Sequence, residues 1–231
     1  MKNILSLSAV ILMVILLLCG CSRDNKDDIT EFSVNPKEIN LTGAGASASL
    51  TASVSNVRWT SENEWVAQVD NAGEITSMHV GKTKIKAVSG SRVIECKCTV
   101  SPRFKTYEEP YLALGKSKDE IVRKLGKPDY QIPSGDAMLV VYGEKDDYQI
   151  TSYAFKNNKL SYILVSLKST DLRVKQIPDF LNERYVLMIE LTTGTTATFT
   201  DSYRIKDASV MVIFDTKPDV GHYVITYEPI R

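Results

Sequence analysis

The sequence predicts an all-β domain followed by an α+β domain, in which an antiparallel sheet carries its helices on one face. Short runs that alternate hydrophobic and polar residues fill residues 29–102, as expected of strands with one buried face. Residues 103–231 instead contain two helix-like segments, each followed by strand-like runs. Pro102 marks the boundary, because all 11 tyrosines follow it whereas both tryptophans precede it. Both parts of this 231-residue chain are long enough to bury a core.

The charge balance excludes one class of partner. The chain carries 28 Lys and Arg residues against 28 Asp and Glu residues, so its formal net charge is zero. Nucleic-acid binding leaves a basic patch or a strongly basic domain, and we therefore expect no nucleic-acid partner. Four cysteines and two histidines supply few metal ligands. We expect neither a metal nor a cofactor.

Residues 1–20 are predicted to be a signal peptide. Lys2 precedes an apolar run from Ala9 to Cys19, which is shorter than the roughly 20 residues that a membrane span needs. The run ends in Leu18-Cys19-Gly20-Cys21, which resembles the lipobox of bacterial lipoproteins. This resemblance implies cleavage before Cys21 and attachment of a lipid to its thiol, so that the lipid holds the chain to the membrane. An ordinary secretory signal with chance cysteines is the alternative.

Residues 21–28 comprise the lipidated cysteine and a flexible tether. Ser22 to Asp28 contain no hydrophobic residue, so burial of apolar surface cannot offset their ordering entropy. The tether includes Lys26, Asp27 and Asp28, which resemble the export tag that sends some gram-negative lipoproteins to the outer face of the outer membrane. The resemblance predicts an outer-membrane lipoprotein exposed at the cell surface. A solvated linker facing the periplasm is the alternative.

Residues 29–102 carry the signals of a sheet. Every second residue from Ile94 to Val100 is apolar, which is typical of a strand with one buried face. The segment Asp70-Asn71-Ala72-Gly73 separates two short runs, and its glycine can adopt the positive φ of a hairpin turn. Its Asp and Asn could suggest calcium ligands, but a calcium loop needs more carboxylates and a distant Glu. We predict a hairpin.

A set of positions spread through the same domain carries a family resemblance: Val34-Asn35-Pro36, Leu41, Gly43, Leu50, Val57–Ser61, Val66–Asp70, Gly73, Gly81–Ala87 and Cys98-Thr99-Val100. In this order they resemble the group 2 bacterial immunoglobulin-like domain of intimin- and invasin-type adhesins, over nearly all of residues 30–101. The resemblance implies a β-sandwich of about seven strands, with Trp59 between the sheets. Such domains act mainly as spacers or adhesion modules, and none of the matched positions is catalytic.

Cys96 and Cys98 lie two residues apart, so a strand directs both side chains to one face. Their Cβ atoms would be about 6.5–7 Å apart at roughly 3.3 Å per residue, whereas a disulfide needs less than about 4.5 Å. Zinc needs four ligands, and His79 is the one histidine of this domain. We expect two buried, inert thiols; accidental oxidation or pairing across chains is the alternative.

The first helix of residues 103–231 is predicted by a capping box, in which Ser117 is the N-cap and Glu120 reaches back to it. Gly126 ends this helix and Pro128 prevents its return. Strand-like runs follow at residues 137–142, 149–155 and 160–167.

A similar order then recurs. Thr170 or Asp171 can cap a second helix that reaches about Arg184, and Pro178 either splits this helix or opens its second half. Runs follow at residues 185–191, 195–200, 208–214 and 222–227. The recurrence suggests an internal duplication of two α-β-β-β units, although the two halves share little residue identity.

Residues 114–129 span the capping box and the first helix, and the hairpin from Tyr153 to Leu160 follows them. Together they resemble a motif of small bacterial lipoproteins, among them one in the outer-membrane β-barrel assembly machinery, and of the β-lactamase-inhibitor-protein fold. Members of these families bind other proteins through an open sheet face and are not enzymes. The resemblance ends near Leu167.

The tyrosines of residues 103–231 suggest a binding face, because tyrosine offers a rigid ring with a polar tip. The candidates are Tyr153, Tyr162, Tyr223 and Tyr227. The alternative is that these residues simply pack under a helix, since tyrosine is a favoured strand residue.

The sequence contains no clear catalytic set. His79 and His222 have no neighbouring nucleophile elbow or metal-spaced partner, so we interpret both as ordinary surface or edge residues. The adjacent pairs Glu108-Glu109 and Asp146-Asp147 would point in opposite directions on an extended chain. The glycines of residues 42–46 precede a strand and not a helix, which argues against a phosphate-binding loop. We therefore predict no catalytic residue.

The order of lipobox, tether, first domain and tyrosine-rich sheet predicts a non-enzymatic, lipid-anchored envelope protein. Its immunoglobulin-like domain would act as a spacer that presents residues 103–231 to a protein or glycan. The alternative is an envelope-assembly or inhibitor-like lipoprotein that binds proteins. A deep pocket holding two close carboxylates would favour a third hypothesis, an enzyme.

Overall fold

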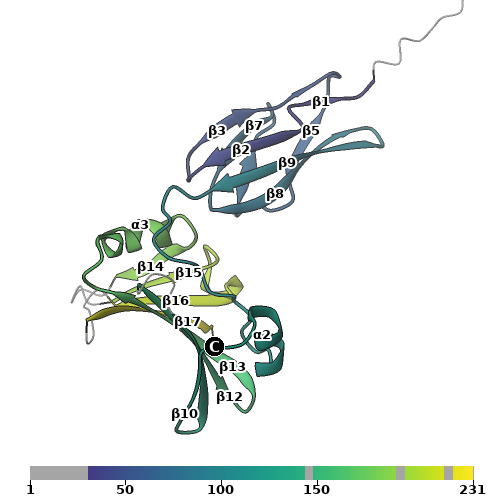
Figure 1. Cartoon of the computed structure of the whole chain (residues 1–231). Helices are drawn as coiled ribbons and strands as arrows, with labels where there is room; N and C mark the ends of the chain where they lie inside the picture. Colours follow the sequence, from purple (N-terminus) through teal and green to yellow (C-terminus); the bar gives the residue numbers. More distant parts are fainter. Residues whose placement is uncertain (1–30, 144–147, 191–195, 216–220, 231) are drawn as a thin grey trace, which may run out of the picture.

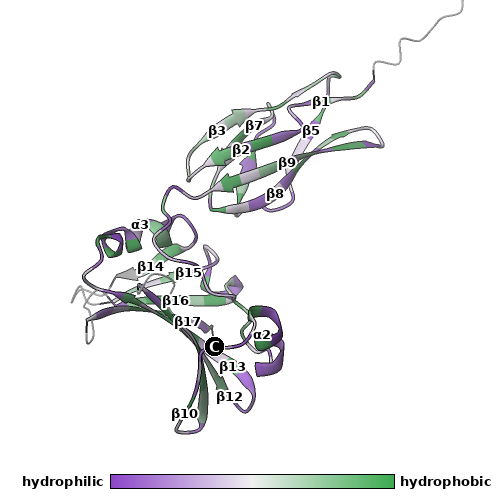
Figure 2. Ribbon diagram, viewed as in Figure 1, coloured by the Kyte–Doolittle hydropathy of each residue, from purple (hydrophilic) through white to green (hydrophobic). Residues whose placement is uncertain are grey.

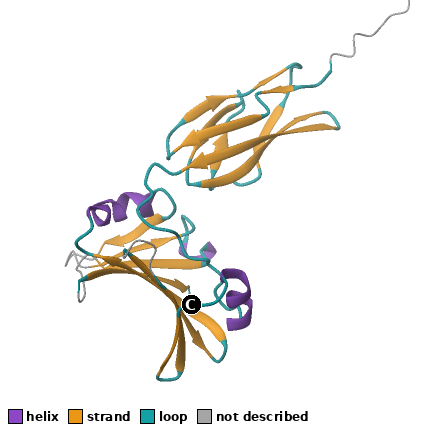
Figure 3. Cartoon of the chain, viewed as in Figure 1, coloured by secondary structure: helices purple, strands orange, loops and turns teal. Residues whose placement is uncertain are grey.

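The computed structural model of the chain describes residues 31–143, 148–190, 196–215 and 221–230. Figures 1 and 3 show two strand-rich regions joined after β9 (Arg92–Ser101). The predicted signal peptide, Cys21 and the tag formed by Lys26, Asp27 and Asp28 lie outside the described residues. Within the described ranges, no helix is both long and apolar enough to cross a membrane.

The first region is a β-sandwich of short strands. One sheet has the order β2-β9-β8-β5 and the other β3-β7-β6, while β1 pairs with β4. β2 and β9 run parallel, and the other pairs are antiparallel. The strands before β9 are β1 (Val34–Asn35), β2 (Glu38–Thr42), β3 (Ser47–Ser49), β4 (Thr51–Ala52), β5 (Arg58–Ser61), β6 (Ala67–Val69), β7 (Glu74–Ser77) and β8 (Gly81–Ser89).

The core of the first domain lies between its sheets and takes side chains from alternate strand positions. On β9, Cys96, Cys98 and Val100 are buried while Lys97 is exposed, and Figure 2 shows this alternation as coloured bands. Trp59 is buried in the same cluster. Both thiols are free and buried, which confirms the prediction of two unbonded core cysteines. Burial raises the pKa of Cys96 to about 11, so its reactive thiolate is scarce at neutral pH.

The predicted hairpin turn joins β6 to β7. Asp70 Oδ1 accepts hydrogen bonds from the backbone N–H groups of Ala72 (2.9 Å) and Glu74 (2.8 Å), so Asp70 closes the turn. Gly73 has φ +86°, and a Cβ there would lie 2.7 Å from the carbonyl oxygen of Leu50. Only glycine fits this close approach.

The second region is one antiparallel sheet of eight strands, in the order β10-β11-β12-β13-β17-β16-β15-β14. Four strands follow each helical region, so the two halves of the sheet meet where β13 pairs with β17. The sequence did not predict β10, because its five residues are all exposed at the sheet edge and include Pro133. The strands are β10 (Tyr130–Ser134), β11 (Ala137–Tyr142), β12 (Gln149–Lys156), β13 (Lys159–Lys168), β14 (Val186–Glu190), β15 (Thr196–Thr200), β16 (Val210–Asp215) and β17 (His222–Pro229).

The first predicted helix is α2 (Lys118–Leu125), and its capping box is formed as expected. Ser117 Oγ accepts from the Glu120 N–H (3.3 Å), and Glu120 Oε2 accepts from the Ser117 N–H (3.0 Å). The second predicted helix is divided into the 3-10 helix η1 (Leu172–Gln176) and α3 (Ile177–Asn182), because Pro178 occupies the first turn of α3. Another 3-10 helix, η2, spans Ile205–Asp207.

Both helical regions and one side of the sheet share a single buried cluster. α2 contributes Ile121, and α3 contributes Ile177, Phe180 and Leu181. The strand residues of this cluster include Val140, Tyr153, Ile163, Val165, Leu167, Phe199, Val212, Ile225 and Tyr227. The side of the sheet that carries them is termed the inner face.

The two domains contact each other at Glu183, directly after α3. The Glu183 side chain is 4% exposed, and its carboxylate accepts hydrogen bonds from the Arg103 N–H (3.0 Å), the Arg103 Nε (2.8 Å) and the Phe104 N–H (3.2 Å). Its carbonyl oxygen accepts from the N–H of Val80 in the first domain (2.8 Å). Arg103 Nη2 also donates to the carbonyl oxygen of Ala44 (3.3 Å). Hydrogen bonds therefore tie α3 to the sandwich.

An aromatic cluster forms the rest of this joint. The ring of His79 stacks on Trp65 with centroids 3.8 Å apart, and its Nδ1 donates a hydrogen bond to the Trp65 carbonyl oxygen (2.8 Å). Tyr203 of the second domain lies edge-on to Trp65 at 5.1 Å. The interpretation of His79 as a surface residue is therefore wrong: it is 5% exposed, because Trp65 and Tyr203 pack around it. Burial lowers its pKa.

Candidate binding site beneath the connecting segment

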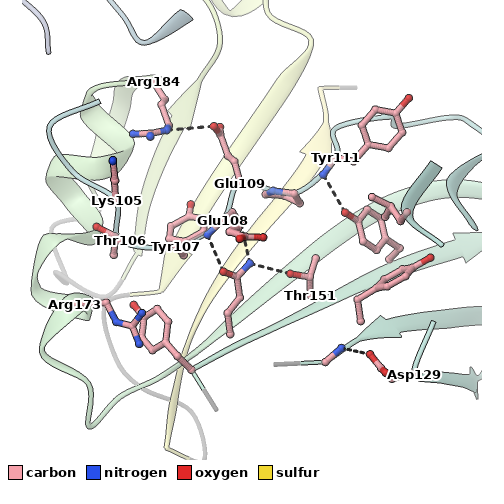
Figure 4. Close-up of a pocket in the computed structure, with 17 residues that line it drawn as sticks. Lys105, Thr106, Tyr107, Glu108, Glu109, Tyr111, Asp129, Thr151, Arg173 and Arg184 are labelled. Carbon is pink, nitrogen blue, oxygen red and sulfur yellow. Dashed lines mark hydrogen bonds and ion pairs between the residues drawn. The ribbon is translucent and has the colours of Figure 1, made fainter. Parts of the chain in front are cut away.

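A cavity of 860 Å³ lies where residues 102–116 approach strands β11 and β12 (Figure 4). These residues run between β9 and α2 and are termed the connecting segment. The volume lies within the about 300–1,000 Å³ typical of ligand sites. Five tyrosines contribute to the lining: Tyr107, Tyr111, Tyr142, Tyr148 and Tyr153.

Side chains of β12 hold the connecting segment in place. Gln149 accepts from the Glu108 N–H through Oε1 (2.8 Å) and donates through Nε2 to the Glu108 carbonyl (2.8 Å), so its amide acts like a neighbouring strand. Gln149 Nε2 also lies 3.1 Å from Thr151 Oγ1. Farther along β12, the Tyr153 hydroxyl accepts from the Tyr111 N–H (3.0 Å). The wall of the cavity is thus fixed at two points.

A buried network closes the cavity toward the core. The hydroxyls of Tyr107 and Tyr227 share a hydrogen bond of 2.5 Å, and the Tyr185 hydroxyl donates to Glu109. Arg184 Nε donates to Glu109 as well (3.2 Å). Desolvation raises the pKa values of Tyr107, Tyr185 and Tyr227, so these hydroxyls stay protonated and act as donors, not as bases.

Arg173 covers one end of the cavity. Its guanidinium lies 3.7 Å from the ring centroid of Tyr148 and pairs with Asp171 through Nε (3.0 Å) and Nη2 (2.9 Å). Tyr148 is 3% exposed, and its hydroxyl has no hydrogen-bond partner among the described residues. Burial raises the pKa of Tyr148 to about 12. This end is therefore aromatic and cationic, but its cation is already paired.

Three carboxylates line the cavity, and the sequence had marked two of them as an adjacent pair. Glu108 and Glu109 both line it, because the connecting segment bends and does not continue as a strand. Glu109 is paired with Arg184 and Tyr185. The third carboxylate, Asp129, is exposed, as are both glutamates. A general acid usually has its pKa raised by burial in an apolar pocket, and these three residues are not buried.

The four predicted binding tyrosines do not form one exposed face. Tyr153 and Tyr227 are 2% and 0% exposed, and the strand register places both on the inner face, each opposite Ile163. Tyr223 lies on the same side and packs against the buried cluster. Tyr162 neighbours Ile163 on β13 and therefore points to the other side of the sheet. The packing alternative holds for the two buried residues.

Sequence reasoning missed the residues that build the cavity. Tyr107, Tyr111 and Gln149 belong to no periodic pattern that would have placed them together. The dense Tyr-Glu-Glu-Pro-Tyr stretch of residues 107–111 is the sequence signal for this site, because it places two aromatic rings beside two carboxylates.

His222 is not on the lining of the cavity. His222 begins β17 and is paired in register with Lys168. Asp146 and Asp147 lie outside the described residues. Within the described ranges, no group of three His, Cys, Asp or Glu residues is placed to hold a metal ion.

The opposite side of the sheet carries hydrophobic and hydroxyl side chains that belong to neither buried cluster. The register places them together: Leu164 of β13, for example, is opposite Thr226, which is opposite Ile213. The members of this set are partly exposed and uncharged, while Glu228, opposite Met211, and Lys168, opposite His222, lie on the same side of the sheet. This set, termed the outer face, comprises Leu139, Ile150, Ser152, Tyr162, Leu164, Ser166, Met211, Ile213, Val224 and Thr226.

Comparison with known proteins identifies the first domain. Residues 29–100 match the family described as bacterial Ig-like domain (group 2). This part of the chain is a bacterial Ig-like domain. Its β-sandwich agrees with that assignment and with an extracellular or surface-associated role. No curated protein matches the chain.

Similarity to solved structures is low. A cysteine-rich secretory protein from Staphylococcus aureus subsp. aureus Mu50 aligns over 50% of this chain and 44% of its own, with 8% identity and a TM-score of 0.26. An extracellular protein containing an SCP domain from Bacillus anthracis str. Ames aligns over 55% and 49%, with 10% identity and a TM-score of 0.27. The chain thus spans less than half the length of either protein, and TM-scores this low identify no shared fold.

Proposed function

We propose that the chain is a non-enzymatic, lipid-anchored protein of the cell envelope, in which the Ig-like domain presents residues 103–231 to a protein or glycan. The lipid would be attached to Cys21. The observation that carries the proposal is the tyrosine-lined cavity of 860 Å³, one wall of which Gln149 and Tyr153 hold in place. A preformed concave site is typical of ligand binding.

The chemistry of the cavity favours binding over catalysis. Its buried tyrosines remain protonated, and Glu109, Arg173 and Arg184 are engaged with protein partners. A nucleophile paired with a base, which covalent catalysis requires, is not found among the described lining residues. The groups that line the cavity therefore suit hydrogen bonding and ring contacts.

The outer face supports the alternative function, an envelope-assembly or inhibitor-like lipoprotein that binds proteins. Packing of both helical regions on the inner face would leave these uncharged side chains free for a partner protein. The resemblance of residues 114–129 to small protein-binding lipoproteins agrees with that use.

A binding experiment separates the two functions. Full-length protein purified in detergent is applied to an oligosaccharide array and to immobilised outer-membrane proteins, alongside Tyr111→Ala in the cavity and Tyr162→Lys on the outer face. The leading function predicts a ligand that Tyr111→Ala weakens, and the alternative predicts a protein partner that Tyr162→Lys weakens. Absence of any ligand for the folded protein would contradict both.

Lipid attachment and location have their own test. Cells that produce the full-length chain should incorporate labelled palmitate into it, and Cys21→Ser should abolish that label and release the protein from the outer-membrane fraction. Surface exposure predicts digestion by protease added to intact cells, and replacement of Lys26, Asp27 and Asp28 by Ala should protect the protein. Unchanged labelling of Cys21→Ser would refute the anchor, and resistance of the wild-type chain until lysis would place it on the periplasmic side.

A further inference from the structure

The rim of the cavity carries an exposed aromatic ring. Tyr111 is 41% exposed, although its backbone N–H is fixed by the Tyr153 hydroxyl (3.0 Å). Tyr142 stands on the same lining, perpendicular to Tyr153 with ring centroids 5.7 Å apart, and donates to the Gly126 carbonyl (3.1 Å). The Tyr142 ring is held by its hydroxyl, whereas Tyr111 is anchored through its backbone and has Lys124 Nζ 5.9 Å from its ring centroid. This anchoring reduces the ordering cost of binding a ligand.

Polar groups line the same cavity. Asp129 Oδ2 accepts from the Gly143 N–H (2.6 Å), and Asp129 is exposed on the lining. The Thr151 hydroxyl accepts from Gln149 (3.1 Å) and keeps its own proton to donate. A purely apolar ligand would displace water from these groups without replacing its hydrogen bonds, which has an unfavourable free energy. The cavity therefore favours a ligand that carries many hydroxyl groups.

The charges of the lining exclude a strongly charged ligand. Three basic residues, Lys105, Arg173 and Arg184, face three acidic residues on the lining. Figure 4 shows the basic side chains at one end and Asp129 and Tyr111 at the other. Arg173 and Arg184 are already paired with carboxylates, so a phosphate or sulfate would gain little there and would meet Asp129 at the aromatic end. A polycation would instead be repelled by the basic side chains at the other end of the cavity.

We infer that this cavity binds the neutral end of a glycan, with sugar rings against Tyr111 and Tyr142 and sugar hydroxyls hydrogen-bonded to Asp129 and Thr151. The weakly polar C–H face of a sugar matches an aromatic face, while its hydroxyls both donate and accept, as these two residues require. The inference rests on the proposed function and names the ligand class that this function leaves open. It assigns the outer face no part in sugar binding.

The test uses full-length protein in detergent and an array of neutral oligosaccharides of glucose, galactose, mannose and N-acetylglucosamine, with sulfated and uronic-acid oligosaccharides as charged probes. Titration calorimetry then measures the dissociation constant of the neutral oligosaccharide that gives the strongest array signal. Tyr111→Ala should weaken it about tenfold or more, as expected for loss of an aromatic ring that contacts the ligand. Tyr111→Phe keeps the ring and should leave it nearly unchanged.

Two further variants separate binding from folding. Thr151→Val keeps the side-chain shape but removes the hydroxyl, and should weaken the same oligosaccharide. Tyr130→Ala removes a tyrosine that is 65% exposed and lies off the cavity lining, and should bind like the wild type. Circular dichroism confirms that every variant is folded.

The possible outcomes test the glycan cavity separately from the proposed binding function. Binding of charged probes alone, or neutral binding that survives Tyr111→Ala, overturns the glycan cavity. The chain could instead capture an outer-membrane protein, lose this capture in Tyr162→Lys and bind no glycan. That result also overturns the glycan cavity but leaves a binding function in place. If the folded protein binds neither sugars nor proteins, both the glycan inference and the proposed binding function are refuted.

Discussion

Replacement of Glu183 probes the joint between the two domains. This carboxylate is nearly buried and is the shared acceptor for the backbone N–H groups of Arg103 and Phe104 and for the Arg103 guanidinium. Glu183→Ala removes the acceptor and leaves these donors in place. Glu183→Gln keeps the shape, but one oxygen becomes an NH₂ group that faces donors.

The expected loss follows from the donors that remain. A buried donor without an acceptor costs about 1–3 kcal/mol. The Arg103 side chain is 51% exposed and can bind water, so the two backbone N–H groups dominate. Glu183→Ala should therefore lower the free energy of unfolding by about 2–6 kcal/mol, and Glu183→Gln by less, because one oxygen still accepts.

Urea unfolding of the chain from residue 22 onward measures this loss. Circular dichroism follows the sheets, and fluorescence follows the two tryptophans. Trp65 lies at the joint, so its emission should also shift to longer wavelength in Glu183→Ala if the joint opens. Glu95→Gln is the matched control, because Glu95 pairs with Lys84 while both side chains are more than 40% exposed. Such exposed pairs contribute little.

Equal stabilities of Glu183→Ala and Glu95→Gln would refute this reasoning. They would mean that water satisfies the Arg103 and Phe104 N–H groups and that the carboxylate does not hold the connecting segment against α3 at the joint. A loss larger in Glu183→Gln than in Glu183→Ala would also contradict it.

Four further outcomes are expected. Tyr203→Ala should shift the emission of Trp65 to longer wavelength without changing the circular dichroism of the sheets. Burial lowers the pKa of His79, so the unfolded chain binds more protons near pH 6 than the folded chain does. The free energy of unfolding should therefore fall on acidification from pH 7 to 5, and it should fall less steeply in His79→Phe. The folded chain keeps the Cys96 proton up to about pH 11, whereas an unfolded thiol loses it near pH 8.5. The free energy of unfolding should therefore fall above about pH 9, and it should fall less in Cys96→Ala. A thiol reagent should label Cys96 only after unfolding. Ser117→Ala should cost about 1 kcal/mol in urea unfolding through loss of the N-cap, while a null effect would deny the capping box a role in stability.

Much of the fold was predictable because its signals are local. The capping box joins residues three apart, and the turn closed by Asp70 and Gly73 joins strands that adjoin it in sequence. The alternation that ends β9 likewise needs only neighbouring residues to be recognised. Where a segment broke these local rules, prediction failed: β10 is exposed and contains Pro133. The division of the second helix at Pro178 was expected, because a proline fits the first turn of a helix but not its interior.

The site was not predictable in the same way. Register alone decided that Tyr153 and Tyr227 are buried while Tyr162 faces outward, because a shift of one residue exchanges the two faces of a strand. The predicted binding tyrosines were therefore divided between two surfaces. Two of the five tyrosines that line the cavity, Tyr107 and Tyr111, lie on a connecting segment with no periodicity.

The sequence by itself determined the positions of the hairpins, the helix start at Ser117 and the sandwich of the first domain, since each depends on residues close together in the chain or on a family pattern. Only the tertiary structure decided that Gln149 would bind the backbone of Glu108, 41 residues away, and that Glu183 would accept from Arg103, 80 residues away. A polar side chain reveals nothing in sequence about which distant backbone group will need its hydrogen bond. That need arises when folding removes water from both, and it is what shaped the cavity and the joint of this protein.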